Sequence, residues 1–536
     1  MDGILSVYKE GGCTSFDVIR RLRFILSERR IGHAGTLDPM AEGVLLVCVG
    51  RATKLLSEIG GTEKVYETEL LLGITTDTED ITGKVLSESE VKTTEEELKE
   101  LLSTMLGEQE QIPPMYSAKR VGGRRLYELA REGKVVERKP CSIVIHEIEI
   151  LKLELPRVRL RVRCGKGTYI RTLCADIGRK LGCGAVMTAL KRTRVGDFSL
   201  EDSHTLSEIE SRKSEGRLSE ILLPPVYSSI ETVLSFGKFD GGHLGHQLIF
   251  DKILEISREK KLRSVLLTFS RSPEGKLLGE KRDRISTEEE HLSRLRSRGF
   301  DRVFELPLTE AFLDMSPEAF IEGVLHRQMH VKELVVGEDA SFGKGARGDV
   351  ALLRRYAEAF GYTVHALKKR ETADEEGELR VISSSLIRKE LSLGRVSRVR
   401  ELLGRYFSLS GTVVHGKRIG GTLLHFPTAN LKPSPGKLIP AFGVYIVRVL
   451  SDQSFYAGIC NVGNNPTVSA ENPVSIESFL LHFQGDLYGK KIRIDFIERL
   501  RPELRFSSLS ELSEQLERDK EEAERFREKH PEIFSV

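Results

Sequence analysis

Long apolar runs are missing from this sequence of 536 residues: no stretch of about 18 residues could span a membrane. The opening segment, Met1-Asp-Gly-Ile-Leu, lacks the basic region and apolar core of a signal peptide, so we expect none. The seven cysteines are scattered, odd in number and form no Cys-x-x-Cys pair. Such cysteines predict reduced thiols, without a disulfide or zinc framework, in a cytoplasmic protein that does not contact a membrane.

Internal repeats are also absent, and the composition (30% charged, 39% hydrophobic, net charge +2) is typical of soluble globular proteins. The length predicts two to four domains. A polar stretch ending in Pro224-Pro225 predicts a linker. We therefore predict a first domain at 1–215, a linker at 216–228, and two further domains at 229–402 and 403–536.

Periodicity predicts a multidomain protein with α+β and α/β parts. After the predicted linker, strands alternate with helices, which predicts a doubly wound parallel sheet. From about Tyr406 onward, short alternating segments separated by Gly, Asn and Pro predict an antiparallel β-barrel. A charged amphipathic helix, Leu509–Phe526, follows the barrel.

The stretch Arg30–Val44 is a glycine-rich loop that holds one carboxylate, Asp38, between Leu37 and Pro39. A carboxylate in an apolar turn has two common explanations. It can be satisfied by nearby backbone N–H groups, or it can be a working group of an active site. The loop alone leaves both open.

Pro156–Arg163 alternates strictly, so a strand would place Val158, Leu160 and Val162 on one face and four arginines on the other. We expect either a solvated outer face or a contact with an anionic partner such as a nucleic-acid backbone. A second basic cluster lies in a glycine-containing loop and comprises Lys119, Arg120, Arg124 and Arg125.

Four blocks in order make the first 200 or so residues similar to the TruB-type tRNA pseudouridine synthases. They are the Asp38 loop, Lys64-Val-Tyr66, Gln111–Ala118 and Gly165–Thr172. The resemblance implies a mixed-sheet domain that isomerises the T-loop uridine of tRNA (position 55 in standard tRNA numbering) to pseudouridine without a cofactor. The RNA-binding PUA-type domain that often follows in this family is expected to be missing or reduced to a stub, since a different pattern already begins at position 226.

The same resemblance assigns roles to single residues. Asp38 is the essential carboxylate, Arg171 its ionic partner, and Tyr66 the tyrosine that stacks on the target base. His33 fills the gap left by the flipped base. The residues expected to contact the substrate are Lys9, His33, Tyr169, Arg159 and Arg161. One departure is Lys9-Glu10, where the family usually has Lys-Pro.

A His-x-Gly-His turn, His243–His246, stands between a predicted strand and a predicted helix. Such a turn lets imidazoles and backbone N–H groups face nucleotide phosphates. With Val335–Gly345 and Ile382–Arg388, the region resembles the FMN adenylyltransferase module of bifunctional RibF proteins. The resemblance implies ATP binding through Gly237, Phe239, Asp240, His243, His246, Ser384 and Arg388. Lys238 and Ser270–Ser272 depart from the family pattern.

The last region carries Gly411–Thr422, Phe426-Pro-Thr-Ala-Asn430, Asn461-Val-Gly463 and Glu477, and resembles bacterial riboflavin kinase. The resemblance implies that Thr428 and Asn430 bind Mg²⁺ and that Glu477 is the base. Gly416, Lys417, Thr422 and Asn461 are the expected nucleotide and flavin contacts.

The leading hypothesis is a fusion enzyme that modifies tRNA and converts riboflavin to FMN and FMN to FAD with MgATP. Its expected partners are tRNA, riboflavin, FMN and ATP, with no stable protein partner. Two alternatives stay open: an inactive adenylyltransferase beside an active synthase and kinase, or an RNA-binding protein with a non-catalytic synthase fold.

Overall fold

The computed structural model describes residues 1–117, 119–134, 136–270, 283–414, 428–464, 474–504 and 506–535. The chain divides into two units. The first comprises 1–232, 309–332 and 341–362, and the second comprises 233–308, 333–340 and 363–536. Within the described residues, no helix combines the length and apolarity needed to cross a membrane.

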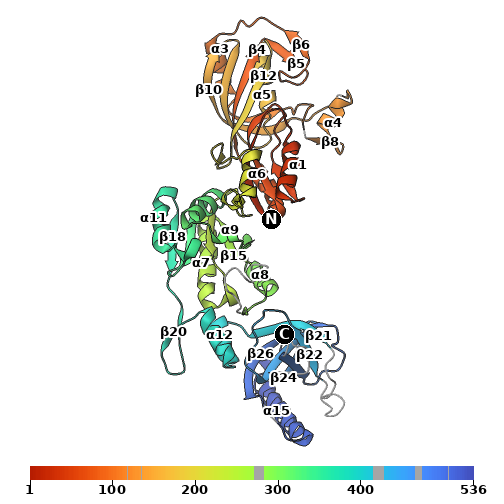
Figure 1. Ribbon diagram of the computed structural model, residues 1–536, viewed down its shortest axis with the longest axis vertical. Coiled ribbons are helices and arrows are strands. Elements are labelled where there is room, and N and C mark those ends of the chain that lie inside the picture. Colours follow the sequence, from red (N-terminus) through yellow and green to blue (C-terminus); the bar gives the residue numbers. More distant parts are fainter. Residues whose placement is uncertain are drawn as a thin grey trace. The chain divides into compact units, whose positions relative to one another are not determined.

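The first unit contains all of the chain before residue 233, including β4, β10 and α5, which Figure 1 labels. Its strands are β1 (Gly3–Lys9), β2 (Ile31–Ala34), β3 (Glu42–Val49), β4 (Lys64–Leu72), β5 (Ile74–Thr76), β6 (Val85–Glu88), β7 (Gly107–Gln111), β8 (Arg120–Val121), β9 (Arg124–Arg125), β10 (Cys141–Glu154), β11 (Arg157–Cys164), β12 (Ala185–Val195) and β13 (Phe198–Ser199). Its helical segments are α1 (Ser15–Leu26), η1 (Gly50–Leu55), α2 (Leu56–Gly60), α3 (Glu95–Thr104), α4 (Leu126–Arg131), α5 (Ile170–Lys180), α6 (Leu206–Ser214), η2 (Leu218–Glu220), α9 (Glu310–Leu313), α10 (Pro317–Ala319), η4 (Phe320–Gln328), η5 (Lys344–Ala346) and α11 (Val350–Phe360).

A nine-stranded mixed sheet organises this unit, in the order β1-β3-β12-β4-β11-β10-β7, with β2 and β13 pairing at its side. β12 runs parallel to β3 and antiparallel to β4. The predicted mixed sheet is confirmed. Part of the predicted Asp38 loop is a strand, because β2 pairs with β3 from Ile31 to Ala34 and leaves only residues 35–41 as the connection.

The segment predicted as a linker, 216–228, packs into the first unit. Leu218 and Ile221 are buried beside α1, and Tyr227 is buried beside Ile4. Apolar side chains at these positions leave water on folding, which outweighs the polar composition of the stretch as a whole. The domain boundaries themselves stay predictions.

The second unit contains a parallel sheet and a barrel. The sheet strands are β14 (Thr232–Phe236), β15 (Arg263–Phe269), β16 (Arg302–Leu306), β17 (Val331–Gly337) and β18 (Thr363–Leu367), with β19 (Glu371–Ala373) and β20 (Leu379–Val381) as a separate hairpin. The barrel strands are β21 (Phe407–Val414), β22 (Ala429–Pro433), β23 (Gly443–Ser451), β24 (Ser454–Asn464), β25 (Val474–Leu480) and β26 (Lys491–Pro502). Its helical segments are η3 (Asp240–Gly242), α7 (Leu244–Lys260), α8 (Glu288–Arg296), α12 (Ser384–Ser392), α13 (Val396–Leu403), α15 (Leu509–Lys529) and η6 (Pro531–Ile533).

The parallel strands lie in the order β16-β15-β14-β17-β18, so the chain reverses direction across the sheet between β14 and β17. Ligands of such doubly wound sheets bind outside the carboxyl ends of the strands at this reversal. α7 follows β14 and buries Phe250, Ile253 and Ile256 in the same cluster as Val233 and Val335. The predicted parallel sheet is confirmed, and its reversal places the turn after β14 at the edge where ligands bind.

The barrel is closed, in the order β21-β22-β25-β24-β23-β26, and its printed strand pairs are antiparallel. Inward residues such as Tyr445, Val447 and Phe496 form its core. Ala523 of α15 packs with Val444 and Ile459, which point outward. The predicted antiparallel barrel and terminal helix are both confirmed.

Candidate active sites

Asp38 and Arg171 form an ion pair in the first unit. Asp38 lies in the 35–41 connection, and Arg171 is the second residue of α5. The Arg171 Nη2 atom lies 3.0 Å from Asp38 Oδ2, with the arginine side chain 6% exposed and the aspartate side chain 31% exposed. The pair therefore fixes a carboxylate that still reaches solvent, as an attacking or orienting group must.

A second carboxylate holds the other side of Arg171. Asp80 Oδ2 lies 3.3 Å from Arg171 Nη1, and that nitrogen also donates to the Thr78 carbonyl at 3.1 Å. Arg171 Nη2 donates to the Tyr116 carbonyl at 3.1 Å. Asp80 was not among the expected site residues, because the run Thr76–Glu79 before it is simply polar in sequence.

The pKa of Asp38 is raised by burial, and the neighbouring Arg171 charge opposes that rise. The Asp80 charge adds to it, and Lys9 opposes it. Burial and the paired guanidinium thus shift the pKa of the Asp38 carboxyl in opposite directions. Arg171, with a smaller contribution from Lys9, therefore favours the charged form of a partly buried carboxylate.

Lys9 positions the Asp38 loop from beneath. Its Nζ donates to the carbonyls of Pro39 (3.2 Å) and Ala41 (2.6 Å), on the carboxyl side of Asp38. Ser15 Oγ donates to the Leu37 carbonyl at 3.1 Å on the other side. Lys9 is 0% exposed, so its ammonium supports the loop in this structure. The expected contact between Lys9 and the substrate stays a prediction.

Tyr66 projects from β4 into the same core cluster as Leu37 and Val162. The guanidinium carbon of Arg192 lies 6.0 Å from the Tyr66 ring centroid. Burial raises the pKa of the Tyr66 hydroxyl. Tyr66 is therefore a neutral phenol on the Asp38 side of the sheet.

Arg192, another residue that sequence reasoning missed, is fully buried and joins β12 to β3 and to the 35–41 connection. Its Nε donates to the Val44 carbonyl at 2.7 Å and its Nη2 to the Gly35 carbonyl at 3.0 Å. Gly43 (φ +106°) lies so close to Arg192 that an added Cβ would be 2.1 Å from the Arg192 carbonyl oxygen. Only glycine fits there. The Lys-Arg-Thr-Arg run 191–194 was the signal that could have drawn attention.

His33 lies in β2, just before the 35–41 connection, and Tyr169 lies just before α5. His33 in β2 is opposite Val47, and burial lowers its pKa. Tyr169 precedes α5, where its N–H donates to Gln111 Oε1 at 2.8 Å and its carbonyl accepts from Gln111 Nε2 at 3.0 Å. Gln111 thereby fixes the start of the helix that carries Arg171.

The arginine row of β11 lies on the opposite face of the sheet. Alternate residues of β11 are buried, and Tyr66 of β4 belongs to the buried face. The outward arginines pair with glutamates of the two neighbouring strands: Arg157 with Glu69, Arg161 with Glu67 and Glu149, and Arg163 with Glu63 and Glu147.

The row is therefore largely neutralised and faces away from Asp38. Of the two explanations left open, the geometry is that of a solvated outer face. Cross-strand neighbours supply Arg161 with the acids that its own strand lacks. The expected substrate contacts of Arg159 and Arg161 stay predictions.

In the second unit, His243 and His246 stack at the turn after β14, with ring centroids 3.7 Å apart. Burial lowers the pKa of His243 to about 4, and burial also lowers the pKa of His246. Both Nδ1 atoms are buried without a hydrogen-bond partner among the described residues. Two neutral imidazoles with open hydrogen-bonding positions suit contact with nucleotide phosphates.

The other expected nucleotide contacts mostly brace this turn. Ser384 Oγ donates to the Asp240 carbonyl at 2.9 Å, and Arg388 pairs with the Asp240 carboxylate. Phe239 (φ +47°) is buried under the turn, and its ring would lie 3.0 Å from a Cβ added at Gly237. The structure gathers all the expected residues but gives Phe239 and Asp240 supporting positions.

The barrel brings Asn430, Glu477 and Asn461 into one row. Asn430 is directly opposite Glu477, and Glu477 is directly opposite Asn461, across β22, β25 and β24. Directly opposed residues share a face, and their buried neighbours Ala429, Ile476 and Val462 point inward. The row therefore lies on the outer face of the barrel. Thr428 precedes β22, whereas Gly416, Lys417 and Thr422 lie outside the described residues.

Comparison with known proteins agrees with this division of the chain. The model of the TruB family pseudouridylate synthase (N-terminal domain) matches residues 23–170, and that of the tRNA pseudouridylate synthase B C-terminal domain matches 171–234. The tRNA pseudouridine synthase B of Clostridium kluyveri is 51% identical over 211 residues, which cover 39% of this chain and 73% of that protein. The chain belongs to the TruB family.

The tRNA pseudouridine synthase B of Lachnoclostridium phytofermentans is 53% identical over 232 residues, 42% of this chain and 76% of its own length. Beyond the TruB region, the FAD synthetase model matches residues 227–385 and the riboflavin kinase model matches 403–527. All three families are enzymes, so the chain is a fusion of a TruB synthase with FAD synthetase and riboflavin kinase regions.

Among solved structures, a macrolide-efflux protein from Streptococcus pneumoniae is 30% identical with a TM-score of 0.50. The match covers 55% of this chain and 94% of that one.

Proposed function

We propose that this TruB-family fusion isomerises the T-loop uridine of tRNA to pseudouridine and also makes FMN from riboflavin and FAD from FMN, using MgATP. The single observation that carries the first activity is the Asp38–Arg171 pair at 3.0 Å in a TruB-type fold. A non-catalytic RNA-binding role gives no reason to hold a desolvated carboxylate against a buried guanidinium.

Asp38 is the group that acts on the flipped nucleotide. Its carboxylate is accessible, while Arg171 favours the ionised form and Lys9 and Ser15 fix the loop on both sides. Breaking a C–N glycosidic bond and forming a C–C bond needs a positioned carboxylate and no metal. Tyr66 lies on the same side of the sheet and suits stacking on the base.

Flavin phosphorylation is proposed for the row Asn430, Glu477 and Asn461. Glu477 accepts a hydrogen bond from Ser475 Oγ at 2.9 Å, so the carboxylate is oriented to take the proton from the flavin ribityl hydroxyl. Thr428 and Asn430 offer oxygen atoms, which Mg²⁺ prefers. When bound with ATP, the ion neutralises charge on the transferred phosphoryl group.

Adenylyl transfer is proposed for the His243–His246 turn. The two neutral imidazoles and the glycines before them form the N-terminus of α7, where phosphate binds readily. Ser384 and Arg388 hold Asp240 and so keep the turn in place.

A mass balance of flavin products tests the proposal on the full chain. Purified protein incubated with riboflavin and MgATP is expected to accumulate FAD by chromatography, and the same preparation is expected to form pseudouridine in a tRNA transcript. Products that stop at FMN would leave the second candidate, a synthase and kinase with an inactive adenylyltransferase, which Lys238 favours.

A further inference from the structure

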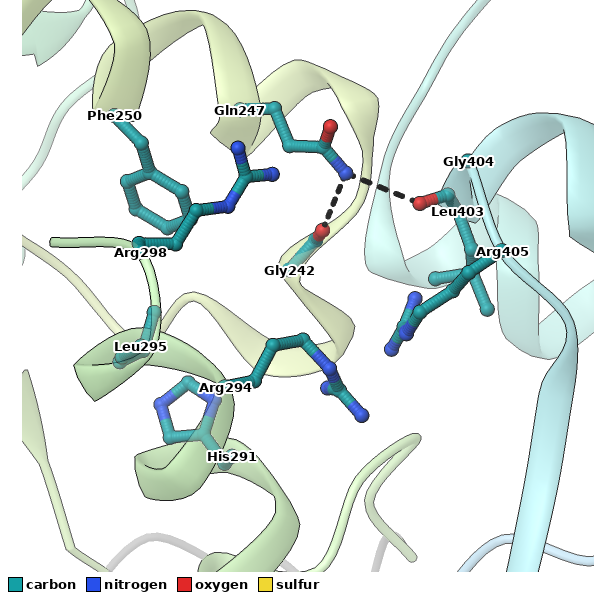
Figure 2. A pocket seen from close by; sticks show the side chains of 10 residues that line it. All are labelled: Gly242, Gln247, Phe250, His291, Arg294, Leu295, Arg298, Leu403, Gly404 and Arg405. Atoms are coloured by element: carbon teal, nitrogen blue, oxygen red, sulfur yellow. Dashed lines mark hydrogen bonds between the residues drawn. The ribbon is translucent and has the colours of Figure 1, made fainter. Parts of the chain in front are cut away.

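A pocket of about 260 Å³ lies beside the nucleotide turn of the second unit and does not include either histidine of that turn among its described lining residues. Two helices and the segment that follows α13 form its walls. The described residues that line it are Gly242, Gln247, Phe250, His291, Arg294, Leu295, Arg298, Leu403, Gly404 and Arg405 (Figure 2). None of the sites assigned above uses this space.

Three arginines line the pocket and make it positively charged. Arg294 and Arg298 come from α8 and the residues after it, and Arg405 comes from the segment after α13. Figure 2 shows the side chains of Arg294 and Arg405 reaching toward the same space, with Arg298 beside Phe250. No acidic residue occurs among the described residues of the lining. The pocket therefore concentrates positive charge.

One of these arginines, Arg405, has a buried donor without a partner among the described residues. Arg405 Nη2 donates to the Gly241 carbonyl at 2.8 Å, while its Nη1 is buried without a partner among the described residues. Arg294 Nη1 donates to Ser286 Oγ at 2.9 Å. A buried guanidinium N–H without an acceptor costs free energy, and a bound anion would remove that cost by accepting the hydrogen bond.

Nearby acids are engaged elsewhere. Glu290 lies 2.5 Å from the Lys437 ammonium, and Asp495 pairs with Arg448 and Arg493. Arg298 faces Asp251 at 3.5 Å, but that carboxylate is 65% exposed and so is well hydrated. Burial and the neighbouring Arg294 charge lower the pKa of Arg405 to about 9, and the Glu290 and Asp495 charges only partly oppose that shift.

The remaining lining fixes the pocket without filling it. Gln247 Nε2 donates to the carbonyls of Gly242 (3.2 Å) and Leu403 (3.1 Å), and thereby joins the start of α7 to the end of α13. Gly242 directly precedes His243. An anion held by Arg294 and Arg405 would therefore lie next to the His243–His246 turn.

We propose that this pocket is an anion site that binds a phosphate group, separate from the nucleotide turn beside it. Guanidinium groups from two different elements can each give two parallel hydrogen bonds to phosphate oxygens. Such a group has two sources, the phosphate of FMN or a free inorganic anion such as pyrophosphate.

Equilibrium binding to the full chain tests the site. The probes are pyrophosphate, FMN and, as the flavin without phosphate, riboflavin; the proteins are wild type, Arg294→Leu and the matched control Arg296→Leu. Arg296 is exposed on the same helix and does not line the pocket. We expect wild type and Arg296→Leu to bind one more equivalent of pyrophosphate than Arg294→Leu, or to bind it roughly tenfold to a hundredfold more tightly.

The arms distinguish the two sources. A loss of FMN binding in Arg294→Leu with unchanged riboflavin binding assigns the site to FMN, and a loss confined to pyrophosphate assigns it to the free anion. Equal stoichiometry and affinity of the three proteins for every probe overturns the proposal.

A second measurement needs no variant and covers the case in which Arg294→Leu does not fold. Phenylglyoxal labels accessible arginines in the wild-type chain, and peptide mass spectrometry locates the labels. Pyrophosphate is expected to protect Arg294, Arg298 and Arg405 but not Arg296. Equal labelling of all four with and without the anion refutes the site.

Discussion

The Asp38 site and the His243–His246 turn solve the same problem, burying a polar group at an active site, in opposite ways. Asp38 has its counter-charge within its own unit, since Arg171 pairs with it and Asp80 holds Arg171. Among the described residues the two histidines have no ion pair: both are buried and neutral, and neither Nδ1 atom has a partner there. The Asp38 carboxylate thus has its counter-charge before a substrate arrives, whereas the two imidazoles leave hydrogen bonds for a ligand to make. Arg171 Nε and His33 Nδ1 are likewise buried without a partner among the described residues.

Asp38→Asn is expected to have the largest effect, because it removes the carboxylate and keeps the shape of the loop. Pseudouridine formation in a tRNA transcript should fall by at least about a thousandfold. FAD formation by the same preparation is the internal control and should not change. Turnover near the wild-type rate would show that Asp38 is a structural turn residue after all.

His243→Ala addresses the other side of the comparison. Without one of two imidazoles aimed at phosphate, conversion of FMN to FAD should slow by roughly a hundredfold. Conversion of riboflavin to FMN should stay the same. If FAD formation is unaffected, the open Nδ1 positions are a packing feature and the nucleotide does not use them.

Lys9→Met tests how much the support of the Asp38 loop contributes to catalysis. The ammonium that holds the Pro39 and Ala41 carbonyls is lost, and the loop with Asp38 loosens. We expect the kcat of the synthase to fall roughly tenfold to a hundredfold, since small misplacement of a reacting group is costly. KM for tRNA should change little. A rise in KM with constant kcat would instead return Lys9 to the substrate-binding role expected from sequence.

Lowering the pH should change the local stability of the two sites differently, without any mutation. The pKa of His243 is about 4 in the folded chain against an ordinary value near 6.5, so the unfolded chain binds more protons between these values. Stability around the turn is therefore expected to fall as pH drops from 7 to 5, by at most about 2 kcal/mol for this histidine.

The Asp38 site should behave differently over the same range. Its carboxyl has a raised pKa, so protonation in the folded state would favour folding as pH falls. Hydrogen–deuterium exchange is measured at pH 7 and pH 5, and each rate is divided by the intrinsic rate at that pH. Protection at pH 5 should be lower than at pH 7 in peptides of α7, with no comparable loss in those of β3. An equal loss of protection in both would contradict the contrast.

Arg161→Gln is expected to do least. The side chain lies on the outer face of the sheet and pairs with Glu67 and Glu149. Exposed pairs contribute about 1 kcal/mol or less, and affinity for tRNA should stay within about twofold. A tenfold loss of tRNA affinity would show that the row contacts RNA despite its glutamate partners.

Much of the fold could be predicted from local pattern. Strict alternation in Pro156–Arg163 predicted a strand that the structure contains, since periodicity is a property of a short segment. Asp38, Arg171 and Tyr66 were named from family motifs, and the structure brings the first two into contact and places Tyr66 in the core beside the loop. Their chemical roles remain proposals.

What the sequence determined by itself was the set of elements, their order and the residues of the motifs. Only the tertiary structure decided which charges meet. The glutamates of β4 and β10 neutralise the arginine row because cross-strand partners are distant in the chain. The side chains of Lys9 and Arg192 are buried, and the Arg192 guanidinium lies near the Tyr66 ring.

The same cause gathers Arg294, Arg298 and Arg405 into one pocket from positions up to about a hundred residues apart. Electrostatic partners follow distance in space, and distance in space is fixed by packing between elements rather than by any short stretch of sequence.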